Sequence, residues 1–148
     1  MNAVLDQPYT ISTDSVIGDW VALKTKGTFH REDSVAVGLL RGDEIVAGVI
    51  YEDWNGASIV CHIAATRLTP LYLAAIFHYP FVVCGATMII APIPDRNDRS
   101  VRLVQHMGFH EAARIQDAHP DGDILLYTLR DSECRFLEPR YLSRLEER

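Results

Sequence analysis

The feature of the sequence that most limits the fold is a segment without formal charge. Between Arg67 and Asp95 there is no Asp, Glu, Lys or Arg. Such a run is long enough to cross a bilayer, which takes about 20 helical residues. Pro80, Gly85 and Pro92 interrupt it, however, and its second part is rich in β-branched residues. We therefore expect a buried helix followed by a buried central strand, and no membrane span.

The residues before this segment predict a helix and an antiparallel meander. Asp14 has the side chain of an N-cap, the apolar face that follows reaches Lys24, and Gly27 ends the helix. Asn55-Gly56 is a strong turn signal between two alternating apolar runs. The three strands expected here cover residues 34–40, 45–52 and 57–64.

The charge-free segment divides at its glycine and prolines. Thr69 is the expected N-cap of a helix with Pro70 at its first position, and Pro80 kinks or shortens that helix. A strand follows over residues 86–91. The connection has the length of a βαβ crossover, so we expect this strand to run parallel to the third meander strand.

The rest of the chain predicts one more helix and a hairpin. The helix covers residues 98–107, with Asn97 at its start and Gly108 as the residue after its end. The two strands expected after it cover 109–115 and 124–129, and a charged tail over 139–148 is loosely helical or frayed. We interpret the whole chain, 1–148, as one α/β domain.

The order helix, meander, helix, strand, helix, hairpin resembles the GNAT superfamily of N-acetyltransferases. The most specific segment is Asn97 to Phe109, which is similar to that family's second motif: an Asn, a small residue three positions on, an amphipathic helix, then Gly-Phe. The chain also resembles short GNAT-like proteins of bacteriophages and prophages. The resemblance implies a mixed sheet, in which a meander precedes a β-α-β-α-β-β half, with a splayed central cleft. It further implies transfer of an acetyl group from acetyl-CoA to an amine.

The same resemblance implies where acetyl-CoA binds. Backbone groups at the end of the third meander strand pair with the pantetheine arm, and the turn into the next helix meets the pyrophosphate. Together with a basic cluster around Asn97, the candidate cofactor residues are Ile63, Ala64, Ala65, Arg67, Leu68, Thr69, Leu71, Asn97, Ser100 and Arg102. The family's glycines in that turn are replaced here by Pro70 and Tyr72, so we expect fewer N–H donors and more bulk. Arg67 and the hydroxyls of Thr66 and Thr69 partly compensate.

Three arginines, Arg96, Arg99 and Arg102, lie close to Asn97 in the sequence. They either meet the phosphates of the cofactor or lie on a solvated helix face.

Aminolysis of a thioester needs a base for the amine proton and an acid for the sulfur. The candidate bases are His62 on the third meander strand and Glu52 at the end of the second; the alternative for His62 is a partly buried histidine bonded to backbone. Cys61 and His62 point to opposite faces of their strand, which argues against a Cys–His pair. Many family members carry a tyrosine as the acid where this chain has Val104, so the acid comes from elsewhere or from water.

Composition limits the partners. The formal net charge of −6 makes the chain a poor general ligand for nucleic acid. The three widely spaced cysteines indicate reduced thiols and a cytoplasmic protein, in the host cytoplasm or a virion if phage-encoded. His106 and His110 are separated by Gly108, so we expect no metal site.

The function remains open between three classes at this point. The first is an N-acetyltransferase that uses acetyl-CoA and an unknown amine. The second is a catalytically inactive GNAT-like phage or prophage structural or interaction protein with a virion or host partner. The third is a module that binds a small ligand in the cleft. Exposed edges of the meander also suggest a homodimer.

Overall fold

The computed structural model describes residues 8–146, which form one seven-stranded sheet in the order β1-β2-β3-β4-β5-β7-β6. The strands are β1 (Tyr9–Ser12), β2 (Val35–Arg41), β3 (Glu44–Glu52), β4 (Ser58–Ala65), β5 (Met88–Pro94), β6 (His110–His119) and β7 (Gly122–Arg130). The α-helices are α1 (Val16–Thr25), α2 (Pro70–His78), α3 (Asp98–His106) and α4 (Pro139–Glu146). A π-helical turn at Tyr79–Val83 and short 3₁₀ turns at Asp131–Glu133 and Arg135–Leu137 complete the order. The expected mixed α/β architecture is confirmed.

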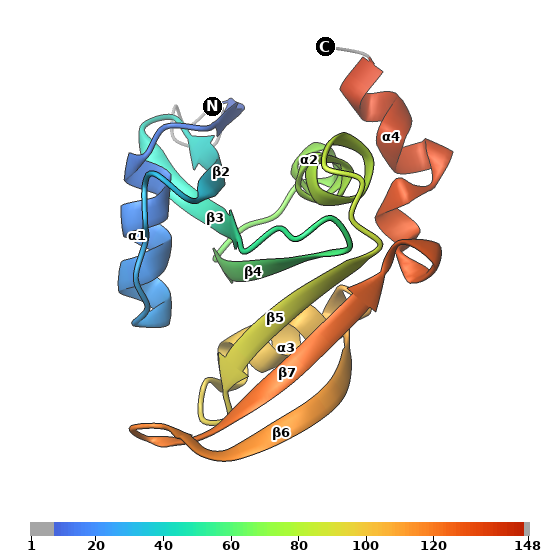
Figure 1. Ribbon diagram of the computed structural model, residues 1–148. Coiled ribbons are helices and arrows are strands. Elements are labelled where there is room, and N and C mark those ends of the chain that lie inside the picture. The colour runs from blue at the N-terminus through green and yellow to red at the C-terminus, as the bar shows by residue number, and fades with distance from the viewer. Residues whose placement is uncertain (1–7, 147–148) are drawn as a thin grey trace.

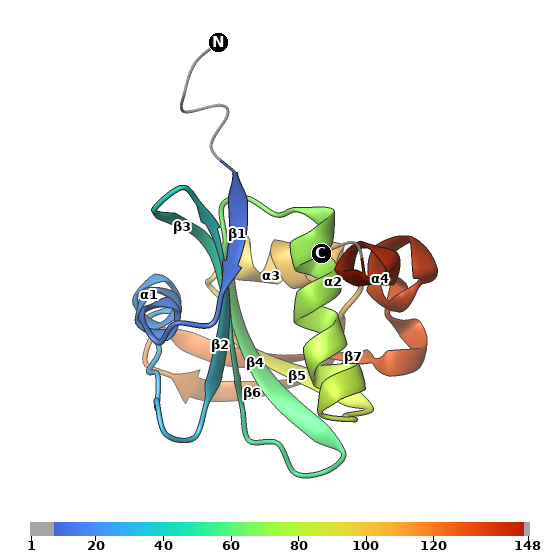
Figure 2. The same ribbon diagram turned by 90° about the horizontal axis from the view of Figure 1, so that it is seen from above.

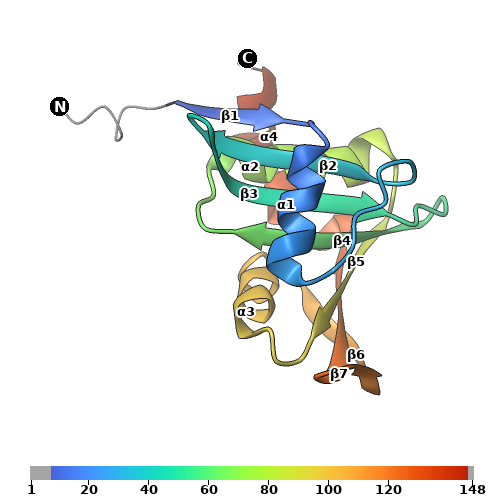
Figure 3. The same cartoon turned by 90° about the vertical axis from the view of Figure 1, so that its left-hand side faces the viewer.

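Helix α1 covers one face of the meander, while α2 and α4 lie on the other (Figure 2). The axis of α1 crosses β2, β3 and β4 (Figure 3). Two strand glycines permit this close contact, because a Cβ on Gly38 would lie 2.4 Å from Ile17 Cδ1 and one on Gly48 would lie 2.5 Å from Val21 Cγ2. Glycine inside a strand therefore marks a close approach here.

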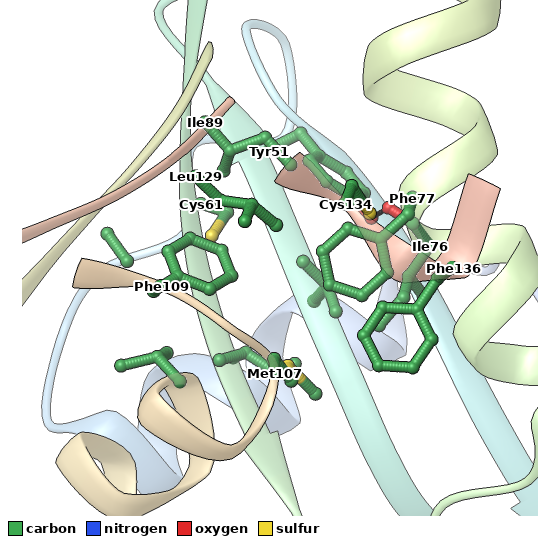
Figure 4. Packing of buried hydrophobic residues seen from close by; sticks show 14 of the residues in the cluster. Tyr51, Cys61, Ile76, Phe77, Ile89, Met107, Phe109, Leu129, Cys134 and Phe136 are labelled. Carbon is green, nitrogen blue, oxygen red and sulfur yellow. Dashed lines mark hydrogen bonds between the residues drawn. The ribbon is translucent and has the colours of Figure 1, made fainter. Parts of the chain in front are cut away.

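The charge-free segment of the sequence forms the centre of the molecule, as predicted. It contains α2, whose Thr69 side chain caps the first turn by accepting from Tyr72 N at 3.1 Å, and then β5 (Figure 1). Phe77 stacks on Phe136 with ring centroids 4.9 Å apart, and Phe109 packs beside them (Figure 4). Within residues 8–146, no helix is long and apolar enough to cross a membrane.

Strands β4 and β5 separate after a short parallel contact. Their pairing covers only Ser58–Val60 with Met88–Ile90, although β4 continues to Ala65 and β5 to Pro94. The predicted end of this strand at residue 91 was wrong, because β5 continues through Pro92 and Pro94. Proline lacks a ladder donor. The pairing of β5 with β7 includes Pro92 and extends to Pro94. The N–H groups that the prolines lack are therefore not needed on the β7 side; they would have faced β4, where the sheet has opened.

Other differences from the sequence prediction are local. Helix α1 begins at Val16 with Ser15 at the N-cap position, but Ser15 makes no side-chain cap bond. The carboxylate of Asp14 accepts from Val16 N at 3.0 Å and so supplies the predicted cap bond. Lys26, with φ 57°, is the left-handed residue that ends the helix in place of Gly27.

Both ends of the described range, 8–146, contain an element that was not firmly predicted. Strand β1 was not predicted; it pairs with β2 and so covers the meander edge expected to be exposed. The tail that was expected to be loosely helical or frayed forms helix α4, which packs against α2, with Tyr141 edge-on to Phe136. Residues 147 and 148 lie outside the described part.

Candidate active site

The separation of β4 and β5 opens a cavity of about 180 Å³, which we call the cleft. Its walls are Cys61–Ile63 on β4 and Ala91–Pro94 on β5. The loop after α1 and the start of α3 complete it, and the remaining lining residues are Thr25, Lys26, Gly27, Asn97, Ser100, His119 and Ile124. The predicted splayed cleft is therefore present.

A second cavity of about 340 Å³, the α3 hollow, adjoins the cleft and shares Asn97 and Ser100 with it. It lies between the end of β4, α1 and α3. Its other lining residues are Trp20, Lys24, Ala64, Ala65, Thr66, Arg99, Arg102, Leu103 and His106. None of these is an acid, so the hollow is electropositive in a chain of net negative charge.

The two predicted bases are hydrogen-bonded to each other at the cleft. His62 Nε2 lies 2.7 Å from Glu52 Oε1, and the two side chains are 26% and 19% exposed. The antiparallel register explains the contact, because Ile50 pairs with His62 and Glu52 with Val60, which places both polar side chains on one face. The alternative of a histidine bonded only to backbone is thereby excluded.

A third cavity of about 340 Å³, the acidic hollow, lies on the other side of this pair. Glu52, Asp53 and His62 line it together with residues at the end of α1 and in the loop after it, which are Thr25, Gly27, Thr28 and His30. The lining of this hollow therefore contains two carboxylates and two imidazoles.

Cys61, next to His62 in the chain, takes no part in this arrangement. Its side chain is buried in the core on the opposite face of β4, and burial raises the pKa of the thiol to about 12. The thiolate that a nucleophilic cysteine needs is therefore scarce at neutral pH.

The turn from β4 into α2 has used several of its own donors. The N–H groups of Thr66 and Arg67 both donate to Val46 O, at 2.7 and 3.3 Å, and the Thr66 hydroxyl donates to the same oxygen at 3.1 Å. The prediction of few donors thus agrees with the structure. Among the described residues, no acceptor is found for the N–H groups of Leu68, Thr69 and Leu71.

The expectation of added bulk at this turn was wrong for Tyr72. Its side chain is fully buried, and its hydroxyl donates to Val37 O at 2.7 Å. Burial raises the pKa of this phenol well above its ordinary value. The aromatic ring therefore replaces the family's glycine without obstructing the outer surface of the turn.

The start of α3 carries polar groups toward both cavities. Asn97 Oδ1 accepts from Ser100 N at 3.2 Å, which confirms the predicted cap. Arg99 Nη2 donates to Ala65 O at 3.2 Å and so connects α3 to the end of β4. Val104, at the position of the tyrosine in the GNAT motif, has no acidic group and is fully buried in the core.

The structure thus brings only some of the predicted site residues together. Those that line the cleft or the α3 hollow are His62, Ile63, Ala64, Ala65, Asn97, Ser100 and Arg102. Those at the α2 turn line neither of these cavities, and they are Arg67, Leu68, Thr69 and Leu71.

His106 and His110, which are four residues apart in the sequence, do not face a common site. His106 lines the α3 hollow, whereas His110 lies 3.3 Å from Glu133. Three residues that line the cleft were not among the predicted site residues: Thr25 at the end of α1, and Lys26 and Gly27 directly after it. The only available signal was that both lysines of the chain fall at this point.

No protein-family model matches the chain, and no curated protein matches it significantly. Solved structures do. A chimera of the Vibrio cholerae spermidine N-acetyltransferase SpeG shares 11% identity over 84% of this chain and 96% of its own, with a TM-score of 0.65. A GNAT family acetyltransferase from Elizabethkingia anophelis with acetyl-CoA bound shares 13% identity over 82% of this chain and 97% of its own, also at 0.65.

The fold is that of the GNAT acetyltransferases.

A further structure with this GNAT fold is YncA, a putative acetyltransferase from Salmonella typhimurium with its cofactor acetyl-CoA. It shares 11% identity over 82% of this chain and 93% of its own, with a TM-score of 0.60. Since these identities are low, the likeness concerns the GNAT fold, and function has to be argued from the site.

Proposed function

We propose that this chain is an acyl-CoA-dependent N-acetyltransferase that transfers the acetyl group of acetyl-CoA to an amine. The observation that carries the proposal is the hydrogen-bonded pair His62–Glu52 at the point where β4 and β5 separate. A strand-borne acid–base pair beside an open sheet edge matches what aminolysis of an extended thioester needs.

The open edge of β4 fits the pantetheine arm of the cofactor. Beyond Val60 the strand has no β5 partner, so the backbone of Ile63, Ala64 and Ala65 can pair with the amides of an added chain. Asn97 and Ser100 border both cavities along this path.

Side chains supply much of the phosphate recognition in this proposal, because the α2 turn retains few donors. Arg102 in the α3 hollow and Arg67 at the turn provide positive charge. The N–H groups of Leu68, Thr69 and Leu71, near the positive end of α2, complete the set.

Acetyl-CoA brings an acyl carbon that is activated as a thioester. The chain's own task is to remove a proton from the attacking amine and to orient it. When His62 donates Nε2–H to Glu52, the lone pair lies on Nδ1, which then accepts the amine proton. Glu52 holds this tautomer and stabilises the imidazolium that forms. Because Val104 carries no acidic group, the thiolate takes its proton from water or from another residue.

The first test is a thermal-shift titration with acetyl-CoA, with CoA and adenosine 3′,5′-bisphosphate as controls. A ligand at 100 times its Kd stabilises the folded state by about 2.7 kcal/mol. We expect a saturable rise in Tm. The absence of any rise at millimolar acetyl-CoA would contradict cofactor binding.

The second test separates catalysis from folding. His62→Ala is expected to lower kcat about 10²–10⁴-fold, measured as thiol release with an accepted amine. His110→Ala is the matched control, since His110 also faces a glutamate but is 68% exposed and lies outside the three cavities. Equal activity of His62→Ala and the wild type would remove His62 from the mechanism.

The N–H groups of Thr66 and Arg67 at the α2 turn already donate to Val46 O and are not available to a cofactor. This observation favours one second candidate, a scaffold without turnover that binds a virion or host protein. The absence of both acetyl-CoA binding and thiol release from any amine would favour that function.

A further inference from the structure

Three of the chain's fourteen lysines and arginines gather on one side of the cleft. The chain's two lysines, Lys24 and Lys26, flank the end of α1. Together with Arg96 they line a cavity of about 240 Å³, which we call the basic hollow. Its other lining residues are Thr25, Pro94, Asn97, His119 and Asp121. Asp121 is the one carboxylate in that lining set, so the cavity attracts anions.

The acidic hollow has the opposite character. Glu52 and Asp53 line it, and its lining contains no lysine or arginine. Thr25 lines the cleft and both of these hollows, so the end of α1 lies where all three meet. A molecule in the cleft would therefore have carboxylates on one side and cationic side chains on the other.

We infer that the acceptor is an amine that also carries an anionic group, a carboxylate or a phosphate; this inference rests on the proposed acetyltransferase function. The ammonium form of the amine is attracted to Glu52 and Asp53 and reaches His62 there. The anionic group is held by Lys26 and Arg96, which fixes the amine at the pair His62–Glu52. A purely cationic acceptor, such as a diamine, places its second charge against the basic hollow and is disfavoured.

The basic hollow is distinguishable from the surface proposed for the cofactor phosphates. Arg96 lines the basic hollow and not the α3 hollow, while Arg99 and Arg102 line the α3 hollow and not the basic one. Lys24 lines both, and its ammonium also lies 5.6 Å from the Trp20 ring centroid, so it is left unchanged in the test.

The test compares matched amines in thiol-release kinetics at saturating acetyl-CoA. The pairs are phosphoethanolamine with ethanolamine and 3-aminopropanoate with 3-aminopropanol, and 1,4-diaminobutane is the dication. We expect kcat/KM to be at least tenfold higher for the anionic member of at least one pair. The pair that shows the effect distinguishes phosphate from carboxylate. Equal values in both pairs, or preference for the diamine, would overturn the inference.

Variants then assign the preference to the basic hollow. Lys26→Gly suits the left-handed backbone at that position, and combined with Arg96→Ala it is expected to reduce the preference at least fivefold while leaving the KM of acetyl-CoA unchanged. Lys26→Arg keeps the charge and the preference. Arg102→Ala is expected to show the reverse, with a raised KM for acetyl-CoA and an intact preference. A preference that survives the double variant would overturn the assignment.

A binding experiment judges the inference even where turnover fails. Calorimetry in the presence of CoA compares phosphoethanolamine with ethanolamine and 3-aminopropanoate with 3-aminopropanol. Tighter binding of an anionic member, lost in the double variant, supports the inference and leaves the failure with the proposed reaction. Equal binding within both pairs overturns the inference itself.

Discussion

Strands β3 and β6 belong to one sheet, but they are enclosed to very different degrees. Every residue from Val46 to Tyr51 on β3 is buried, because α1 covers one face and α2 the other. Every residue from His110 to Ala118 on β6 is exposed. β5 and β7 lie between these extremes, with alternate residues buried. The enclosed half thus fixes the pair His62–Glu52, while the open half leaves room for ligands beside it.

The largest expected effect comes from adding a side chain to buried strand β3 and comparing it with a matched change on exposed β6. Gly48→Val is expected to destabilise the protein by about 3 kcal/mol or more, because its Cβ would lie 2.5 Å from Val21 Cγ2 in a packed layer. Urea unfolding measures the change. Ala113→Val on exposed β6 is the matched control, with an expected effect within about 0.5 kcal/mol. Similar values for the two variants would show that the halves do not differ in packing.

The two capped helices next to the cleft sharpen the comparison. Thr69→Ala and Asn97→Ala each remove a cap and are each expected to cost about 1 kcal/mol in thermal or urea unfolding. Only Asn97 lines the cleft and the α3 hollow. Asn97→Ala is therefore expected also to weaken acetyl-CoA binding several-fold more than Thr69→Ala does. Equal weakening would place the cofactor closer to the α2 turn.

The smallest expected effect concerns the tip of the β6–β7 hairpin. Asp123 accepts from Asp117 N at 3.0 Å and from Arg114 Nη1 at 2.7 Å, and these bonds lower the pKa of its carboxyl. Because the pKa of Asp123 is lower in the folded state, its hydrogen bonds contribute to the free energy of unfolding above the unfolded pKa of about 3.9. That contribution is lost as the pH falls through the folded-state pKa.

Asp123→Asn is therefore expected to flatten the acid limb of the stability curve slightly, below about pH 4. Unfolding midpoints measured from pH 2 to pH 6 check this. An unchanged acid limb would mean that the hairpin tip opens independently of the rest of the sheet.

Much of the fold was predictable because it rests on local signals. The cap at Thr69, the glycine after α3 and the absence of charge between Arg67 and Asp95 each predicted an element that the structure contains. β1 was missed because Tyr9–Ser12 is too short to show a period, and its pairing with β2 is a tertiary contact.

The candidate site was less predictable, for a physical reason. His62 and Glu52 were each identified, but their contact depends on the register of β3 against β4, which a single residue of slip would destroy. The position of Lys26 depends on how the loop after α1 folds over the cleft, and no pattern in the sequence specifies that path.

The two prolines of β5 have a consequence for the protein without ligand. A sheet that opens for part of its length has a competing arrangement, in which the free edges zip together and the cavity disappears. Pro92 and Pro94 offer no donors to such a ladder, so the zipped arrangement gains little. The two prolines thus keep the cleft open in the absence of ligand. A ligand that enters has no existing strand pairing to break.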